Sequence, residues 1–256
     1  MYQENSPELG PENESPVVQE VEITMLRHSE PEYVDLVVGK TFKEIAELDE
    51  KGTFAKSGIK YPGGFKLAQG VGREMEELGV IPDLIVTSPL ERAKETAILI
   101  GGELTRDEPS VDEDNQSPGI RMAVVEEFTE LEPDAESFIY AQNQMREQGL
   151  LEDPERLSSW EEAGQYYRIA MNHWFENNHD EIEERVDTTI GCLKDLAQNR
   201  NAKNILIVSH GFSLNAIHAR IERRDISSIL QQKGIEPGKG YKLGVELESG
   251  LIKIKE

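Results

Sequence analysis

Cysteine and positive charge are both scarce in this sequence. Cys192 is the single cysteine among 256 residues, which excludes an internal disulfide and a cysteine-based zinc cluster. The sequence has 27 lysine and arginine residues against 50 aspartate and glutamate residues, and a formal net charge of -23. It also lacks the clustered basic stripe that neutralises a nucleic-acid backbone, and its negative field repels polyanions. We therefore expect no nucleic-acid partner.

Long hydrophobic runs are missing as well. No uninterrupted apolar stretch approaches the roughly 18 residues that a membrane-spanning helix needs, and the first residues contain neither a basic region nor an apolar signal core. We therefore expect no membrane partner and a cytoplasmic location.

Residues 1–18 are rich in Glu, Pro, Asn and Ser. The little apolar surface that they could bury does not offset the conformational entropy that they would lose on ordering. We predict a disordered acidic tail there.

The rest of the chain alternates between segments typical of strands and of helices. With 37% hydrophobic residues over this length, we expect one well-buried domain spanning residues 19–256. Short apolar or alternating runs predict strands at residues 21–26, 83–87, 124–128 and 204–208. Apolar residues at three- and four-residue spacing predict helices at residues 64–78, 90–104 and 182–197. This order predicts an α/β fold with a mostly parallel sheet and helices on both faces.

Two later segments depart from that alternation. Residues 140–175 are helical in character and mixed in polarity, so we assign a helical cap insertion to residues 133–178. The cap is expected to lie over one end of the sheet and to select the substrate. Residues 241–254 predict a hairpin at the sheet edge, with its turn at Ser249 and Gly250.

Polar side chains follow three of the predicted strands. Arg27 and His28 come directly after the first strand, and His210 follows the last parallel one. Arg92 lies a few residues beyond the second strand. Ligands of parallel α/β sheets bind beyond the carboxyl ends of the strands. We therefore expect these side chains to converge on one site.

The converging residues suit the chemistry of a phosphate ester. Arg27 and Arg92 each present a permanently charged planar fork that matches phosphate oxygens. His28 is the candidate nucleophile at phosphorus, provided that a backbone carbonyl holds its other ring nitrogen and fixes the tautomer. His210 is expected to donate to the phosphoryl oxygens. The backbone N–H of Gly211, at the mouth of a helix, adds a further donor.

A phosphate ester also needs a proton donor for its leaving alkoxide. A carboxylic acid beside a phosphate dianion has its pKa raised by the like charge and by burial. Glu130, which follows the strand predicted at residues 124–128, is our candidate for this donor. Glu127 and Glu132 lie close enough in the sequence to compete for the role.

Three segments resemble the signature of a known family. Residues 26–30, L-R-H-S-E, resemble the L-R-H-G-E start of the histidine phosphatase superfamily, of the phosphoglycerate-mutase-like kind. Residues 87–97, T-S-P-L-E-R-A-K-E-T-A, are similar to its S-S-P-L-x-R-A-x-x-T-A segment, and residues 208–211 are similar to its V-S-H-G. Weaker matches are residues 128–130, to its L-x-E acid segment, and residues 185–186, to the arginine-valine that opens a late helix.

The resemblance implies a particular mechanism. It implies a phosphohistidine intermediate on His28, a phosphate pocket formed by Arg27, Arg92 and His210, a carboxylic proton donor, and no metal or other cofactor. These implications predict a hydrolase, a metal-independent phosphomonoesterase similar to histidine acid phosphatases, acting on a small phosphorylated substrate. No sequence pattern indicates an oligomeric state.

Two departures from the family pattern keep alternatives open. Ser29 replaces the usual glycine after the nucleophile, which adds a side chain that either is tolerated there or bonds the ligand. The mutase-type continuation after the glutamate is absent, because residues 31–35 read P-E-Y-V-D. A phosphatase is therefore favoured over a phosphoglycerate mutase-type phosphotransferase. A non-catalytic phosphate-binding or scaffold protein of the same fold is the other alternative.

Overall fold

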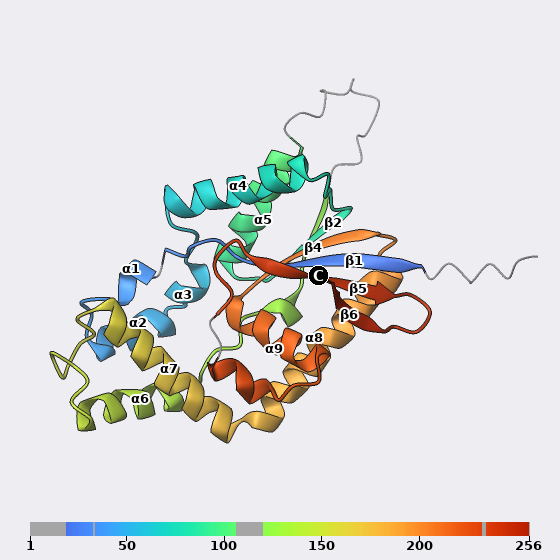
Figure 1. Ribbon diagram of the computed structural model, residues 1–256. Helices are drawn as coiled ribbons and strands as arrows, with labels where there is room; N and C mark the ends of the chain where they lie inside the picture. The colour runs from blue at the N-terminus through green and yellow to red at the C-terminus, as the bar shows by residue number, and fades with distance from the viewer. Residues whose placement is uncertain (1–18, 33, 106–119, 232–233, 256) are drawn as a thin grey trace, which may run out of the picture.

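The computed structural model describes residues 19–32, 34–105, 120–231 and 234–255 (Figure 1). At its centre lies a six-stranded sheet in the order β3-β2-β4-β1-β5-β6. β3, β2, β4 and β1 run parallel, whereas β5 and β6 are antiparallel, which confirms the mostly parallel sheet. The predicted tail at residues 1–18 lies outside the described residues. The strands are β1 (Glu20–Arg27), β2 (Leu84–Thr87), β3 (Arg121–Val124), β4 (Asn204–Ser209), β5 (Gly240–Glu246) and β6 (Ile252–Lys255).

Helices cover both faces of the sheet, as Figure 1 shows. Successive side chains of a strand point to opposite faces, so neighbouring residues of β4 enter different cores. Leu206 packs in the cluster with Met75 and Ile100, on the side of α4 (Gly63–Glu77) and α5 (Glu91–Leu104). Ile205 packs in the cluster with Leu193 and Leu214, on the side of α8 (His179–Asn199) and α9 (Gly211–Ile221). Residues 205–208 of β4 are therefore all apolar, because both faces of the strand are buried there.

The predicted edge hairpin is confirmed. β5 pairs antiparallel with both β1 and β6, and the turn between β5 and β6 contains Gly250 with a φ of 64°. Glycine adopts this left-handed conformation without steric cost. Among the described residues, no helix has both the length and the apolar character needed to cross a membrane.

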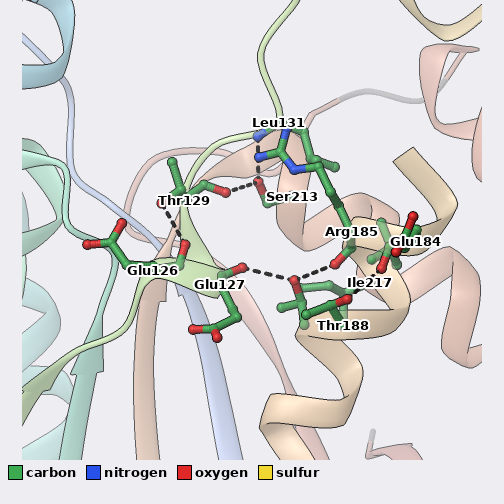
Figure 2. Close-up of a pocket in the computed structure, with 11 residues that line it drawn as sticks. Glu126, Glu127, Thr129, Leu131, Glu184, Arg185, Thr188, Ser213 and Ile217 are labelled. Atoms are coloured by element: carbon green, nitrogen blue, oxygen red, sulfur yellow. Dashed lines mark hydrogen bonds between the residues drawn. The ribbon is translucent and has the colours of Figure 1, made fainter. Parts of the chain in front are cut away.

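The strand predicted at residues 124–128 is displaced. The strand is β3, which ends at Val124, and Glu126–Phe128 form the 3-10 turn η1 instead. Thr129 closes this turn by donating its hydroxyl to the Glu126 carbonyl at 2.6 Å (Figure 2). β3 is an edge strand whose Met122 and Val124 side chains are exposed, so its residues lack the alternation that marks a half-buried strand.

Two separate chain segments build the helical layer at one end of the sheet (Figure 1). α6 (Ala135–Glu147) and α7 (Trp160–Asn177) lie in the segment predicted to be helical. Phe42 joins them in one cluster with Met145 and Tyr166. The sequence prediction missed the segment of Phe42, although Thr41 and Glu44 form a capping box, a signal readable from T-x-x-E. The helices of this segment are α1 (Val34–Val37), α2 (Phe42–Glu50) and α3 (Thr53–Lys56).

Candidate active site

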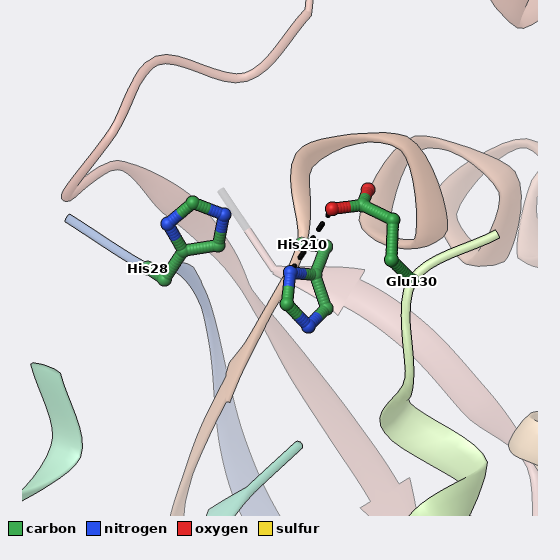
Figure 3. Close-up of side chains that lie close together, drawn as sticks. All are labelled: His28, Glu130 and His210. Atoms are coloured by element: carbon green, nitrogen blue, oxygen red, sulfur yellow. Dashed lines mark ion pairs between the residues drawn. The ribbon is translucent and has the colours of Figure 1, made fainter. Parts of the chain in front are cut away.

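Strand register brings two histidines together. β1 and β4 are parallel neighbours in which Arg27 pairs with Ser209, so His28 and His210 each follow their strand by one residue. Their ring centroids lie 5.0 Å apart at an interplanar angle of 61°, and both side chains are buried. Figure 3 shows the two rings beside the carboxylate of Glu130.

The His28 ring is held in one tautomer. Its Nδ1 lies 2.5 Å from the carbonyl oxygen of Ser29, and a carbonyl only accepts, so the proton is on Nδ1 and Nε2 keeps its lone pair. Burial lowers the pKa of His28 well below 6.5, and the nearby His210 and Arg92 lower it further. The imidazole is therefore neutral near neutral pH, the form in which Nε2 is a nucleophile.

Ser29 is accommodated by a contact outside the anion cluster. Its hydroxyl donates to the carbonyl of Gly64 at 2.6 Å, and its N–H donates to the hydroxyl of Thr96 at 3.0 Å. A Cβ on Gly64 would lie 2.8 Å from the Glu30 carbonyl oxygen, so a side chain there would push the two segments apart. The Ser29 hydroxyl is therefore engaged by a backbone carbonyl of α4.

Glu130 lies at the centre of the converging side chains. Its Oε2 lies 3.0 Å from Nδ1 of His210 and forms an ion pair with Nη2 of Arg92 at 3.4 Å. Burial raises the pKa of the Glu130 carboxyl, but His210, Arg92 and His28 outweigh burial and hold that pKa at about 2. Nε2 of His210 lies 2.7 Å from the hydroxyl of Ser88. The Glu130 carboxylate is thus the anion that the cluster holds.

The two competing glutamates occupy different places. Oε1 of Glu132 lies 3.5 Å from Nη2 of Arg92, and burial together with the Glu130 charge raises the pKa of Glu132. Glu127 is exposed and lines a separate cavity with Arg185 (Figure 2). The structure therefore brings Glu130 and Glu132 to Arg92 and leaves Glu127 elsewhere.

The two arginines that are predicted to bind phosphate lie at the end of β1 (Arg27) and in the first turn of α5 (Arg92). Arg92 is 1% exposed and donates through Nη1 to the Phe54 carbonyl at 3.0 Å. Arg27 donates through Nη1 to the Ile235 carbonyl at 2.5 Å. A Cβ at Gly211 would lie 3.1 Å from Nε of Arg27. Glycine at the first position of α9 thus leaves room for the Arg27 side chain beside His210.

The same residues also have the geometry of a metal site. One ligand atom each from His28, Glu130 and His210 lies within 4.8 Å of the others. The guanidinium of Arg92 lies 3.4 Å from the same Glu130 oxygen that would bind a cation, and like charges this close repel strongly at a buried position. The cluster is therefore better suited to an anion than to a metal ion.

Comparison with known proteins identifies the family. A family model described as the histidine phosphatase superfamily (branch 1) matches residues 62–239, which is more than half of the chain. This chain belongs to the histidine phosphatase superfamily. The matched range includes Arg92, Glu130 and His210 and begins after His28.

Solved structures of a mutase and of a phosphatase share the fold. A phosphoglycerate mutase from Bacillus anthracis is similar with a TM-score of 0.55 and 16% identity, over 93% of this chain and 93% of that chain. A phosphoserine phosphatase from Entamoeba histolytica, in complex with 3-phosphoglyceric acid, is similar with a TM-score of 0.52 and 17% identity, over 92% of this chain and 95% of that one. The comparison with curated proteins finds no match.

In this member of the superfamily, distant residues fix the backbone on both sides of Glu130. The hydroxyl of Ser213 donates to the Thr129 carbonyl at 3.2 Å and accepts from the Leu131 N–H at 3.0 Å (Figure 2). Nη2 of Arg185 donates to the Glu130 carbonyl at 3.3 Å. The resemblance had singled out Arg185, whereas Ser213 was missed, because the contacts of a serine one turn into a helix have no sequence signature.

Removal of the Ser213 hydroxyl is expected to disturb Glu130 without touching the side chains that are predicted to bind phosphate. We predict that Ser213→Ala lowers the free energy of unfolding by about 1 kcal/mol and lowers turnover by about tenfold, because the carboxyl is less well positioned. Urea unfolding and initial rates measure the two effects. Ser249→Ala is the matched control, since that hydroxyl also makes two hydrogen bonds, but in the distant hairpin. Equal rate losses in both variants would contradict the prediction.

The lowered pKa of Glu130 also makes a prediction about acid stability. A carboxyl whose pKa falls from 4.5 to about 2 on folding stabilises the native state above pH 4.5 and loses this contribution as the pH falls toward 2. The shift corresponds to as much as about 3 kcal/mol. We expect Glu130→Gln to be less stable than the native protein at about pH 6 in urea unfolding, with the difference shrinking by about pH 3. A difference that does not change with pH would contradict this account.

Proposed function

We propose that this protein is a metal-independent phosphatase that hydrolyses a small phosphate monoester through a phosphohistidine on His28. The observation that carries the proposal is the 2.5 Å contact between Nδ1 of His28 and the Ser29 carbonyl, from which we infer that Nδ1 carries the proton and Nε2 keeps its lone pair. Histidine acts as a nucleophile only in this neutral form. The membership of the superfamily supports the same reaction class.

A phosphate group would replace the Glu130 carboxylate as the anion of the cluster. Arg92 and His210 already contact that carboxylate, and both are suited to phosphoryl oxygens. Arg27 supports this role because its buried Nε has no hydrogen-bond partner among the described residues. A buried donor without a partner is costly and is rare in native proteins. A bound dianion would satisfy it.

The proposed reaction has two displacement steps. In the first, Nε2 of His28 attacks phosphorus, an N–P bond forms, and the ester P–O bond breaks. Glu130, freed from Arg92 and His210 by the phosphate, takes up a proton because the adjacent like charge raises its pKa, and it passes that proton to the leaving alkoxide. In the second, Glu130 accepts a proton from water as the water oxygen attacks phosphorus and the N–P bond breaks. Phosphate leaves and His28 is regenerated.

The decisive experiment is hydrolysis of an aryl phosphate across acidic to neutral pH, with a chelator present. Turnover that survives the chelator supports the metal-independent route. A parallel assay with phosphoglycerate separates a phosphatase, which releases inorganic phosphate, from a mutase, which isomerises the substrate. Orthovanadate binding without turnover on a broad panel of monoesters would overturn the enzymatic proposal and favour a phosphate-binding protein. The Glu130 carboxylate next to His210 shows that the cluster can hold an anion, and this observation favours the phosphate-binding protein as the second candidate function.

A further inference from the structure

A second cavity lies behind the segment that carries Glu130. It has a volume of about 340 Å³ and lies between η1, α8 and the start of α9 (Figure 2). Thr129 and Leu131, the two neighbours of Glu130, form part of its wall, and His28, Arg92 and His210 do not line it. One short segment therefore separates the anion cluster from the cavity.

Arg185 is the cation of this cavity. Among the described residues, its guanidinium makes one hydrogen bond, to the Glu130 carbonyl at 3.3 Å, and no ion pair. A guanidinium has five N–H donors and pairs bidentately with carboxylates. Its remaining donors suit the carboxylate of a ligand.

Acidic side chains border the same cavity. Glu126 and Glu127 lie on one side of Arg185, and Glu184 lies on the other (Figure 2). These carboxylates would repel a simple anion, and the guanidinium would repel a simple cation. A zwitterion meets both charges with the opposite sign. The buried side chains of Val186 and Ile217, also in the lining, complement an apolar group.

We propose that this cavity binds a small zwitterion of the amino-acid type with an apolar side chain, and that its occupancy acts on Glu130. The ligand carboxylate pairs with Arg185, its ammonium group meets Glu184 at the rim, and its side chain contacts Ile217. Arg185 then divides its donors between the ligand and the Glu130 carbonyl. Because the Glu130 carboxylate lies 3.0 Å from His210, a change in this backbone segment reaches the anion cluster. The coupling is reciprocal by thermodynamic necessity.

The test is a titration of the full-length, isotope-labelled protein with L-leucine, followed by NMR. Two further probes each retain one of the two charged groups of L-leucine: isocaproate has the carboxylate alone, and isoamylamine has the ammonium group alone. We expect saturable L-leucine binding with a Kd of about 1 mM or tighter, and binding of each half at least about tenfold weaker. Signals of Thr129, Leu131 and the His210 ring are expected to shift. This readout needs no turnover, so it is independent of the proposed phosphatase activity.

Matched variants locate the binding site. Arg185→Gln is expected to weaken L-leucine binding at least about tenfold, whereas Arg168→Gln, an equal charge change at an exposed position of α7, leaves it unchanged. Glu184→Gln removes one rim carboxylate and is expected to weaken binding even if Arg185→Gln does not fold. Absence of saturable binding, equal binding of isoamylamine, or full binding by both cavity variants would overturn the site. Binding that leaves the His210 signals unmoved would overturn its action on Glu130.

Discussion

Replacement of His28 by alanine is expected to lower phosphate monoester hydrolysis by at least about 10³-fold. The reason is local: Nε2 of His28 is the proposed nucleophile, and its Nδ1 is fixed by the Ser29 carbonyl at 2.5 Å. Initial rates with an aryl phosphate measure the loss. Rapid quenching of the native protein in alkali should trap phosphate on a histidine as an acid-labile adduct, and the variant should trap none.

Two controls separate this chemical effect from a loss of structure. His28 is 1% exposed, so its truncation leaves a small cavity, and thermal unfolding must confirm that the variant is folded. His179→Ala removes a histidine at the first position of α8, a half-exposed position away from the cluster, and is expected to leave the rate unchanged. Hydrolysis or histidine labelling that persists in a folded His28→Ala protein would refute the phosphohistidine route.

The sheet and the meeting of its strand ends were predictable for one reason. Buried parallel strands are continuous apolar runs, and β2 and β4 have that form because both of their faces are covered. β1 is the parallel neighbour of β4, so the carboxyl ends of β1 and β4 must lie side by side. The placement of His28 next to His210 follows from that rule and from the position of each histidine one residue past its strand.

Contacts between distant segments were not predictable in the same way. The edge strand β3 exposes most of its side chains, so its sequence carries no alternation and the prediction was displaced toward Val125 and Phe128. The partners of Ser213 and Arg185 are backbone atoms of the Glu130 segment, 82 and 55 residues away in the chain. A backbone carbonyl has the same chemistry at every position, so no residue type marks such a partner.

The lowered pKa of Glu130 was also not predictable from the sequence. A carboxylic acid near a phosphate site was expected to have a raised pKa, yet the pKa of Glu130 without ligand is about 2, because His210, Arg92 and His28 outweigh burial. The raised pKa was expected for a glutamate next to a phosphate dianion, whereas the pKa of about 2 belongs to a carboxylate next to His210, Arg92 and His28. The two descriptions agree only if phosphate binding displaces the carboxylate from those partners and raises its pKa.

Glu130→Gln therefore provides a test that depends on the leaving group. The variant keeps the size of the side chain but has no proton to transfer, so hydrolysis of an alkyl phosphate is expected to fall by about 10²- to 10⁴-fold. An aryl phosphate with an acidic phenol as its leaving group needs little protonation, and its rate is expected to fall far less. The measurement is kcat for both substrates in both proteins. A uniform loss would mean that Glu130 contributes by position or charge and not by proton transfer.

Glu132→Gln is the matched competitor, because Glu132 also contacts Arg92 and has a raised pKa even without ligand. If Glu130 is the donor, Glu132→Gln slows both substrates by similar small factors, and Glu127→Gln, at an exposed position apart from Arg92, changes neither. If instead the loss specific to the alkyl ester appears in Glu132→Gln, the proton comes from Glu132. Glu130 would then serve as the anion that holds Arg92 and His210 in place until phosphate arrives.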